Sequence, residues 1–494
     1  MRETVYDVIV VGAGPGGSSA ATFLAQRGLS VLLLDKADFP RDKVCGDGLT
    51  PQALVWLDVL GCLDEVLAQA DSCVTSFDLF INGEHVLTTG FPRDTPYPAF
   101  GTCLQRSKLD HILVKNAVSH GAALKTSHLV RKLIWLKNGI AAEAESTKTK
   151  RTVRFNGRLL IGADGANSIV SRSLGNVLRD GTVTVSLRAY YQDVTVDLSP
   201  VKFFFSERFF PGYGWLFVDD RGKGNAGFAY VADQNFPMKR SLKKMLCDFV
   251  GSDLKEMLRG AAPMGSPAGW WTCFSKPKAI VADRVMLIGD AANLADPMNG
   301  AGIHKAMESA YVASEVAVHA LSSGDCSQQA LSLYERSWNE RTELDRRTGE
   351  LFLSIVKNPN LGELYLFLLK ALGRLAAADQ RVRDLSSGIF SGVIPQRMCL
   401  SPPALLNVLP LDPKTWSSVL RAPDGSGLQS WLEVISSAAR KSLKMSGRIA
   451  ASPLENLDWG VEVLSKTLGL LGSYARDRVI SSPWTTLSAF GSGP

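Results

Sequence analysis

Three glycines near the amino terminus have the spacing of a loop that binds the diphosphate of a dinucleotide. Gly12, Gly14 and Gly17 directly follow an apolar run at residues 6–11. The first glycine permits a tight turn, the second lets the backbone approach a diphosphate, and the third lets a helix pack closely on a strand. The diphosphate would lie at the amino terminus of that helix, where unpaired N–H groups and the helix dipole attract negative charge.

The residues around this loop predict the elements that position it. Residues 6–11 are predicted to form a strand, residues 18–26 a helix that stops at Gly28, and residues 31–34 a second strand. The second strand ends at Asp35, whose carboxylate is placed to accept hydrogen bonds from a ribose. The strand before the loop and the acid-ended strand after it make the glycine spacing far more specific for a dinucleotide.

Two later stretches repeat the pattern of a buried strand that ends in a polar turn. Asp164 follows one apolar run, and Gly289 with Asp290 follows another. Pro297 and the run from Gly300 to Gly302 then precede a long predicted helix at residues 303–321. The chain is therefore expected to return to the nucleotide sheet, where all three stretches would contact one ligand.

Together these three stretches resemble the flavoprotein monooxygenase superfamily typified by para-hydroxybenzoate hydroxylase, over roughly residues 4–400. The resemblance implies FAD as cofactor. It places Asp290 at the ribityl chain, Arg106 near the diphosphate, and the backbone of residues 300–302 near the flavin O2, where reduction builds negative charge. The cofactor-binding residues expected from the motifs and the resemblance are Gly12, Gly14, Gly17, Asp35, Lys36, Cys45, Gly46, Asp47, Arg106, Asp164, Gly289, Asp290, Pro297, Gly300, Ala301 and Gly302.

Two longer motifs resemble a narrower family, the geranylgeranyl reductases and menaquinone reductases, which saturate double bonds in isoprenoid chains. These motifs span residues 39–51 and 211–217. The sequence departs from the family pattern at Val218, where a proline is common, and at Ala301, where an acidic residue is common. Residues 412–494 match no counterpart in the family. These departures weaken the assignment of the substrate more than the assignment of the cofactor.

The resemblance implies three catalytic candidates, Cys45, Tyr213 and Trp215. Saturating an isolated double bond with reduced flavin needs a hydride at one carbon and a proton at the other, so a nearby acid is useful. Cys45 is the candidate for that role, and the two aromatic residues would line an apolar tunnel and stabilise transient positive charge. The alternatives are that the cysteine is a small buried hydrophobe and that the aromatic residues are sheet core.

The predicted fold class is mixed α/β, with a Rossmann-type FAD-binding domain interleaved with an antiparallel substrate sheet and followed by helices. The expected FAD-binding parts are residues 1–75, 105–180 and 276–325. The expected substrate parts are an insertion at 76–104 and an antiparallel sheet at 181–275. A helical region at 326–411 and a helical C-terminal extension at 412–494 complete the predicted organisation.

Composition and residue spacing limit the partners that this chain is expected to have. The chain has 494 residues and a formal net charge of +6 without a long basic block, which disfavours a nucleic-acid surface. No apolar run is long enough to span a bilayer, and the first strand begins too early for a signal peptide. Eight scattered cysteines and six histidines lack metal-type spacing, so no metal site is predicted and a reducing cytoplasm is favoured.

The last predicted helix carries an apolar stripe, formed by Leu457, Val461, Leu464, Leu468 and Leu471 at alternating spacings of four and three. The favoured interpretation is that this stripe packs on its own protein. The alternative is contact with a membrane surface, which would make the protein cytoplasmic but membrane-associated. The oligomeric state stays open.

The leading functional hypothesis is an FAD-dependent reductase of an isoprenoid or another long apolar polyene, with NADPH or a protein electron carrier as reductant. The second is an FAD-dependent monooxygenase or halogenase of secondary metabolism, which would use oxygen at the same flavin site. The third is a polyene cyclase in which FAD is a fixed structural element. The loop at residues 45–51 and the 213–217 segment favour the first hypothesis.

Overall fold

The predicted dinucleotide fold is present in the computed structural model, which describes residues 4–179, 181–196, 199–233, 235–238, 240–400 and 426–476. Strand β1 (Val5–Val11) lies between β2 (Val31–Leu34) and β11 (Thr152–Gly162), and all three are parallel. Most of their apolar side chains are buried, as expected for a parallel sheet.

Strand β18 (Val285–Leu287) pairs in parallel with β11, so the chain does return to the nucleotide sheet after residue 284. The order is β17-β18-β11-β1-β2-β8, and β10 and β9 extend from β11. These strands are β8 (Ala123–Lys125), β9 (His128–Leu136), β10 (Gly139–Ser146) and β17 (Val281–Ala282). The helices of this part are α1 (Pro15–Gln26), α2 (Pro51–Val59), α3 (Leu63–Ala68), α4 (Arg106–Ser119), α5 (Ile169–Ser173), the 3₁₀ helix η1 (Gly289–Ala292) and α7 (Ile303–Ser323).

A second sheet has seven strands in the order β16-β12-β15-β14-β13-β5-β6. The pair β13 and β5 is parallel, whereas the other pairs are antiparallel, so the sheet is mixed rather than purely antiparallel. Its strands are β5 (Ser76–Ile81), β6 (Glu84–Gly90), β12 (Val183–Gln192), β13 (Val201–Phe205), β14 (Gly212–Val218), β15 (Gly224–Ala232) and β16 (Ala262–Cys273).

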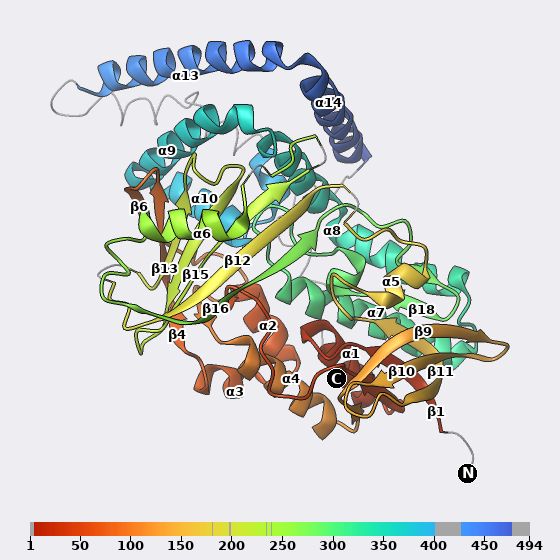
Figure 1. Cartoon of the computed structure of the whole chain (residues 1–494). Coiled ribbons are helices and arrows are strands. Elements are labelled where there is room, and N and C mark those ends of the chain that lie inside the picture. Colours follow the sequence, from red (N-terminus) through yellow and green to blue (C-terminus); the bar gives the residue numbers. More distant parts are fainter. Residues whose placement is uncertain are drawn as a thin grey trace.

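The two faces of this sheet have different neighbours. Alternation along β14 places Leu216 on the face that packs against Phe249 of α6 (Leu242–Gly251), together with Phe204. Tyr213 and Trp215 lie on the opposite face. Helices α9 (Gly362–Ala378) and α10 (Gln380–Ser391) cover the end of the sheet formed by β5 and β6 (Figure 1).

The segment at residues 36–51 is rich in glycine, proline and charge, a composition that predicts a loop outside the core, but part of it forms a strand and is buried. Strand β3 (Gly48–Leu49) pairs with β7 (Gly101–Cys103), which also pairs with β4 (Ser72–Val74) in a three-stranded sheet. Asp47 and Leu49 are buried. The burial of Asp47 is possible because other side chains satisfy its carboxylate, a tertiary effect that composition does not reveal.

Helices follow the nucleotide sheet, as the sequence predicts. Helix α8 (Gln328–Val356) lies within the predicted helical region at residues 326–411, and the short helices η2 (Pro359–Leu361) and η3 (Gln396–Leu400) flank α9 and α10. Two further helices, α13 (Ser426–Ala451) and α14 (Pro453–Arg476), form the described part of the predicted C-terminal extension. Figure 1 shows α13 above α9 and α14 turning down towards α8. Residues 412–425 and 477–494 of that extension lie outside the described residues. No helix in the described ranges is long and apolar enough to cross a membrane.

The apolar stripe of α14 does not pack on the described part of the protein, which corrects the favoured interpretation. Its five residues are each 59–63% exposed. The face that packs against α8 is instead the one carrying Trp459, Glu462, Lys466 and Leu470; Trp459, for example, donates a hydrogen bond to the Ser354 carbonyl oxygen. Spacing alone identified the stripe, but a polar network on the other face decides which side of the helix faces inwards.

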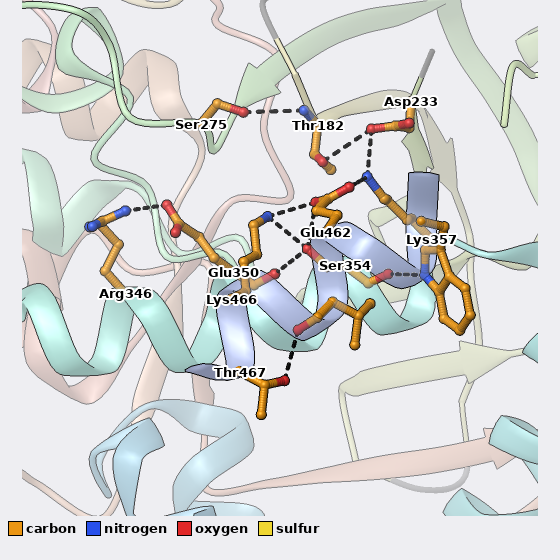
Figure 2. Close-up of polar contacts among 12 residues, drawn as sticks. Thr182, Asp233, Ser275, Arg346, Glu350, Ser354, Lys357, Glu462, Lys466 and Thr467 are labelled. Carbon is orange, nitrogen blue, oxygen red and sulfur yellow. Dashed lines mark hydrogen bonds and ion pairs between the residues drawn. The ribbon is translucent and has the colours of Figure 1, made fainter. Parts of the chain in front are cut away.

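Figure 2 shows that network. Lys357, at the end of α8 and 2% exposed, donates to Asp233 at 2.8 Å and to Glu462 at 2.5 Å. Glu462 also accepts hydrogen bonds from Lys466 and Ser354, both at 2.8 Å. Partial burial raises the pKa of Glu462, but the hydrogen bonds from Lys357 and Lys466 outweigh it and lower the pKa to about 2. The network ties α14 to α8 and to the end of β15.

The charge on Glu462 makes the attachment of α14 sensitive to acid. Because its folded-state pKa is below the ordinary 4.5, its contribution is present above pH 4.5 and is lost as the pH falls towards 2. Glu462→Gln is expected to lower the free energy of unfolding at neutral pH by about 1–3 kcal/mol and to weaken its pH dependence below 4.5. Urea titrations from pH 7 to pH 3 test this, with Glu340→Gln at an exposed position of α8 as control. If the free energy of unfolding of Glu462→Gln changed with pH as steeply as that of the original chain, the prediction would be contradicted.

Candidate functional site

The loop between β1 and α1 has the shape that a diphosphate requires. A Cβ atom at Gly12 would overlap the Ala163 carbonyl oxygen, and one at Gly17 would overlap the Gly12 carbonyl oxygen, so both must be glycine. A Cβ at Gly14 meets nothing within 4 Å. Gly14 is also the N-cap of α1 and supplies no side-chain cap to the first turn. The open space in front of uncapped helix N–H groups fits an anionic diphosphate.

Asp35 lies at the end of β2 and holds this loop in place. One carboxylate oxygen accepts a hydrogen bond from the Ala13 N–H at 2.8 Å, and the other accepts from the Ala37 N–H at 2.8 Å. Each carboxylate oxygen can accept a second bond, so the side chain keeps capacity for a ribose hydroxyl. The next residue, Lys36, is exposed.

Arg106, at the start of α4, is held by a buried carboxylate. Its guanidinium makes two hydrogen bonds to Asp110, at 2.7 and 2.8 Å, and Arg41 contacts the same carboxylate at 2.9 Å. Asp110 has 0% exposure. Two guanidinium groups therefore share the Asp110 carboxylate, and Arg41 also lies 3.9 Å from the Asp35 carboxylate.

The loop that carries Cys45 is fixed to the second sheet by Asn225 of β15. The Asn225 amide donates to the Cys45 carbonyl oxygen at 2.9 Å and to the Asp47 carboxylate at 2.8 Å. Asp47, which has a positive φ of 67°, also accepts from the Tyr190 hydroxyl at 2.5 Å. The Trp215 indole donates to the Asn225 side-chain oxygen at 3.1 Å. Both polar atoms of the Asn225 side chain therefore have partners in the site.

Charged groups surround the Cys45 thiol. Burial raises its pKa, while the charges of Arg106 and Lys43 act in the opposite direction and Asp47 adds to the rise. Loss of hydration and the charge of Arg106 lower the pKa of Lys43, which also lies near Asp290. A thiol with a raised pKa stays protonated at neutral pH and can act as an acid, not as a nucleophile.

The Gly300 loop meets the second sheet at Tyr213. The Tyr213 hydroxyl donates to the Asn299 carbonyl oxygen at 3.3 Å, and Gly300 has a φ of +72°, which favours glycine. A Cβ at Gly302 would lie 3.5 Å from an Asp290 carboxylate oxygen. The structure therefore brings β14 together with Asp290 and the Gly300 loop, which come from a distant part of the chain. Burial raises the pKa of Tyr213 to about 12.

The aromatic face of β14 borders both the Cys45 loop and the Gly300 loop. A Cβ at Gly46 would lie 3.3 Å from the Phe217 ring and 3.7 Å from the Trp215 indole nitrogen. Phe203 and Phe205 of β13 continue this face, with ring centroids 6.1 and 5.9 Å from that of Tyr213. The aromatic residues predicted from the sequence are therefore partly sheet core and partly a wall beside the two loops.

The other predicted site residues lie at the same edge of the nucleotide sheet but have local partners. The Asp164 carboxylate accepts from the Ser168 hydroxyl and from the Ile169 N–H at 2.7 Å, so it caps α5. Gly289 donates its N–H to Ser309 at 3.1 Å, and Pro297 packs near Gly349 of α8. Ala301 donates its N–H to the Asn299 side chain at 2.9 Å.

The structure adds residues that the sequence analysis did not single out. Lys43, Asp110, Tyr190 and Asn225 all contact or surround the predicted site. Asn225 is a polar residue at a buried strand position, which is a usable signal. Asp110 four residues after Arg106 is the spacing of a helical ion pair, a second signal.

Asn225→Leu is expected to lower the free energy of unfolding by about 1–3 kcal/mol, because it leaves the buried Asp47 carboxylate and Trp215 indole short of partners. Chemical denaturation with circular dichroism measures this. Tyr190→Phe, which removes only one hydrogen bond to Asp47, is the matched comparison, with an expected loss of about 1 kcal/mol. An Asn225→Leu protein as stable as the original would show that the network does not hold the loop.

Comparison with known proteins identifies the cofactor and the family. Residues 5–222 match the FAD binding domain family. The chain is 29% identical over 349 residues to a digeranylgeranylglycerophospholipid reductase of Methanothrix thermoacetophila, covering 68% of this chain and 83% of the relative. It is 30% identical over 323 residues to a menaquinone reductase of Mycobacterium tuberculosis, covering 63% and 76%.

The fold is also similar to a solved structure, that of a geranylgeranyl bacteriochlorophyll reductase-like protein from Thermoplasma acidophilum. The TM-score is 0.63 at 23% identity, and the match covers 87% of this chain and 100% of the other. The glycine loop and the Cys45 loop lie within residues 5–222, the range that matches the FAD binding domain family. The chain therefore belongs to the family of FAD-dependent oxidoreductases that contains the geranylgeranyl reductases and menaquinone reductases.

Proposed function

We propose that this protein reduces carbon–carbon double bonds in an isoprenoid or another long apolar polyene. The proposal rests on one observation: the Cys45 loop and the Gly300 loop both lie against the aromatic face of β14. A proton donor and an apolar wall are therefore next to each other in the site. The relatives named as reductases of a geranylgeranyl lipid and of menaquinone support the same class of substrate.

In this proposal the residues divide into three roles. Gly12, Gly14 and the first turn of α1 hold the FAD diphosphate, while Asp290 and the Gly300 loop hold the flavin end. Bound FAD, once reduced, supplies hydride. Cys45 donates the proton to the second carbon, which its raised pKa allows at neutral pH.

The aromatic residues have the third role. Tyr213 and Trp215 form a wall that excludes water and stabilises positive charge as it develops on the polyene. NADPH is the proposed reductant, binding transiently, and a reducing cytoplasm is the proposed location, because all eight cysteines are free thiols. Contact with the membrane that holds an isoprenoid substrate would be peripheral.

The test is the redox cycle of the purified protein under anaerobic conditions. NADPH or dithionite is expected to bleach the yellow flavin spectrum, and a polyprenyl compound is expected to restore it without oxygen. Mass spectrometry of the polyprenyl compound should show a gain of two hydrogens per turnover. A saturated polyprenyl chain of the same length is the control and should not reoxidise the flavin.

Two other results would replace the proposal. Reoxidation by oxygen alone, accelerated by an aromatic or polyketide substrate, would identify a monooxygenase or halogenase. Product formation while the flavin resists reduction would identify a cyclase that uses FAD as a structural element.

A further inference from the structure

Helix α14 presents a narrow apolar stripe to solvent. Its residues, called the α14 stripe below, are each 59–63% exposed. Surface leucines scattered singly are ordinary, but five in one row on one helix form a continuous apolar surface. The residues of the α14 stripe are Leu457, Val461, Leu464, Leu468 and Leu471.

The outward direction of the stripe is fixed by the opposite face of the helix. Glu462 and Lys466 join the network around Lys357, shown in Figure 2, and the Gly469 carbonyl oxygen accepts from Arg347 of α8 at 3.1 Å. Leu470 is 2% exposed. Turning the stripe inwards would break these contacts and leave Lys357, itself 2% exposed, with fewer partners. The stripe is therefore displayed by a rigidly held helix.

The spacing of the stripe identifies the kind of surface that fits it. Intervals of four, three, four and three place all five residues at the a and d positions of two successive heptads, with leucine at every d position and Val461 at an a position. A strict a/d stripe is the seam of a coiled coil, whereas a helix that lies on a membrane carries a broader apolar face.

The residues beside the seam favour a helix and disfavour an anionic lipid surface. Gly460, Ser465 and Gly472 flank the stripe, and small side chains there allow a second helix to approach closely. The sequence of α14 as a whole holds three acidic and two basic residues, so the helix lacks the lysine- and arginine-rich polar face that attracts anionic lipids.

We propose that α14 pairs with α14 of a second copy of this chain, so that the protein is a dimer joined by a two-stranded coiled coil. Ten side chains, five from each copy, bury roughly 100 Å² each, which reaches about 1,000 Å², the lower limit of a specific interface. Two heptads alone make a marginal helix, but here α8 already holds α14 in helical form. The seam residues are self-complementary, as a two-fold interface requires.

The full-length holoprotein tests this by sedimentation equilibrium across a range of concentrations. The chain is expected to be a dimer that the double variant Leu464→Glu with Leu468→Glu converts to a monomer, with a dissociation constant raised by at least about 100-fold because charges face each other in the seam. Leu443→Glu is the matched control, since Leu443 lies on α13 and is 75% exposed; it should leave the dimer unchanged. Circular dichroism and flavin content confirm that each variant is folded.

Cysteine cross-linking determines whether the two helices are parallel or antiparallel. Leu464 is the central residue of the stripe, so Leu464→Cys is expected to form an intermolecular disulfide whether the pair is parallel or antiparallel. Leu457→Cys would cross-link to itself only in a parallel pair. The original chain, with Cys73 and Cys247 exposed, measures the background.

Three results would overturn the proposal. The chain could be monomeric at every concentration, or the dimer could survive the double variant. A monomer that floats with neutral or anionic phospholipid vesicles, and loses this binding in the double variant, would show that the stripe contacts lipid instead. None of these measurements depends on the reductase reaction.

Discussion

Replacing Gly14 with valine is expected to leave the folded chain intact and to weaken FAD binding by about 100-fold. The backbone at Gly14 is extended, with φ at −78° and ψ at −172°, and a Cβ there meets nothing within 4 Å. The protein alone therefore tolerates a side chain. Its branches would occupy the space in front of the α1 N–H groups, and losing two hydrogen bonds to a charged group costs about 3 kcal/mol.

Titration of the apoprotein with FAD, followed by flavin fluorescence, gives the dissociation constant, and thermal unfolding of the apoprotein gives the stability. Gly251→Ala in α6 is the matched control, because a Cβ at Gly251 also meets nothing within 4 Å and the position is far from the glycine loop. Gly17→Ala serves as contrast, since a Cβ there overlaps the Gly12 carbonyl oxygen and should destabilise the fold itself. Normal FAD affinity in Gly14→Val would remove this loop from the cofactor site.

Cys45→Ala is expected to keep its flavin and to lose turnover by about 10²- to 10⁴-fold, the range typical for loss of a positioned proton donor. The cofactor contacts proposed for this loop lie in its backbone, which Asn225 holds through the Cys45 carbonyl oxygen. The alanine variant keeps that bond and loses only the thiol. Anaerobic reoxidation of the reduced flavin by a polyprenyl compound measures the effect.

The pH dependence of that reaction adds a second readout. Because burial raises the pKa of Cys45 above the ordinary 9.0, the thiol stays protonated through neutral pH, and the rate should fall only as the pH rises beyond 9.0. Cys103→Ala, in the neighbouring strand β7, is the matched control and should show the original rate and pH profile. Full activity in Cys45→Ala would remove the thiol from the mechanism.

Local sequence patterns were sufficient to predict the strands and the helix that bind the nucleotide. The apolar run before Gly12, the glycine spacing and the acid at Asp35 each depend on residues near one another in the chain, and strands β1 and β2 with helix α1 formed where they predicted. Helix α8 likewise lies within the helical region predicted at residues 326–411. Two separate motifs also sufficed for the family, because each one is long and their order along the chain is specific.

Only the tertiary structure decided the contacts between distant segments. The sequence singled out Cys45 and Tyr213, but it did not show that Asn225 and Tyr190 would hold the Cys45 loop, since hydrogen bonds over 140 residues or more of chain leave no periodic trace.

The same limit explains the error on α14. Periodicity identifies an apolar stripe on a helix, but the side that faces inwards depends on the side chains of the neighbouring helix. Here α8 offers a buried lysine, Lys357, which requires carboxylate partners, and Glu462 provides one. The polar face of α14 is therefore turned inwards and its leucines outwards, an outcome that the sequence of α14 alone could not determine.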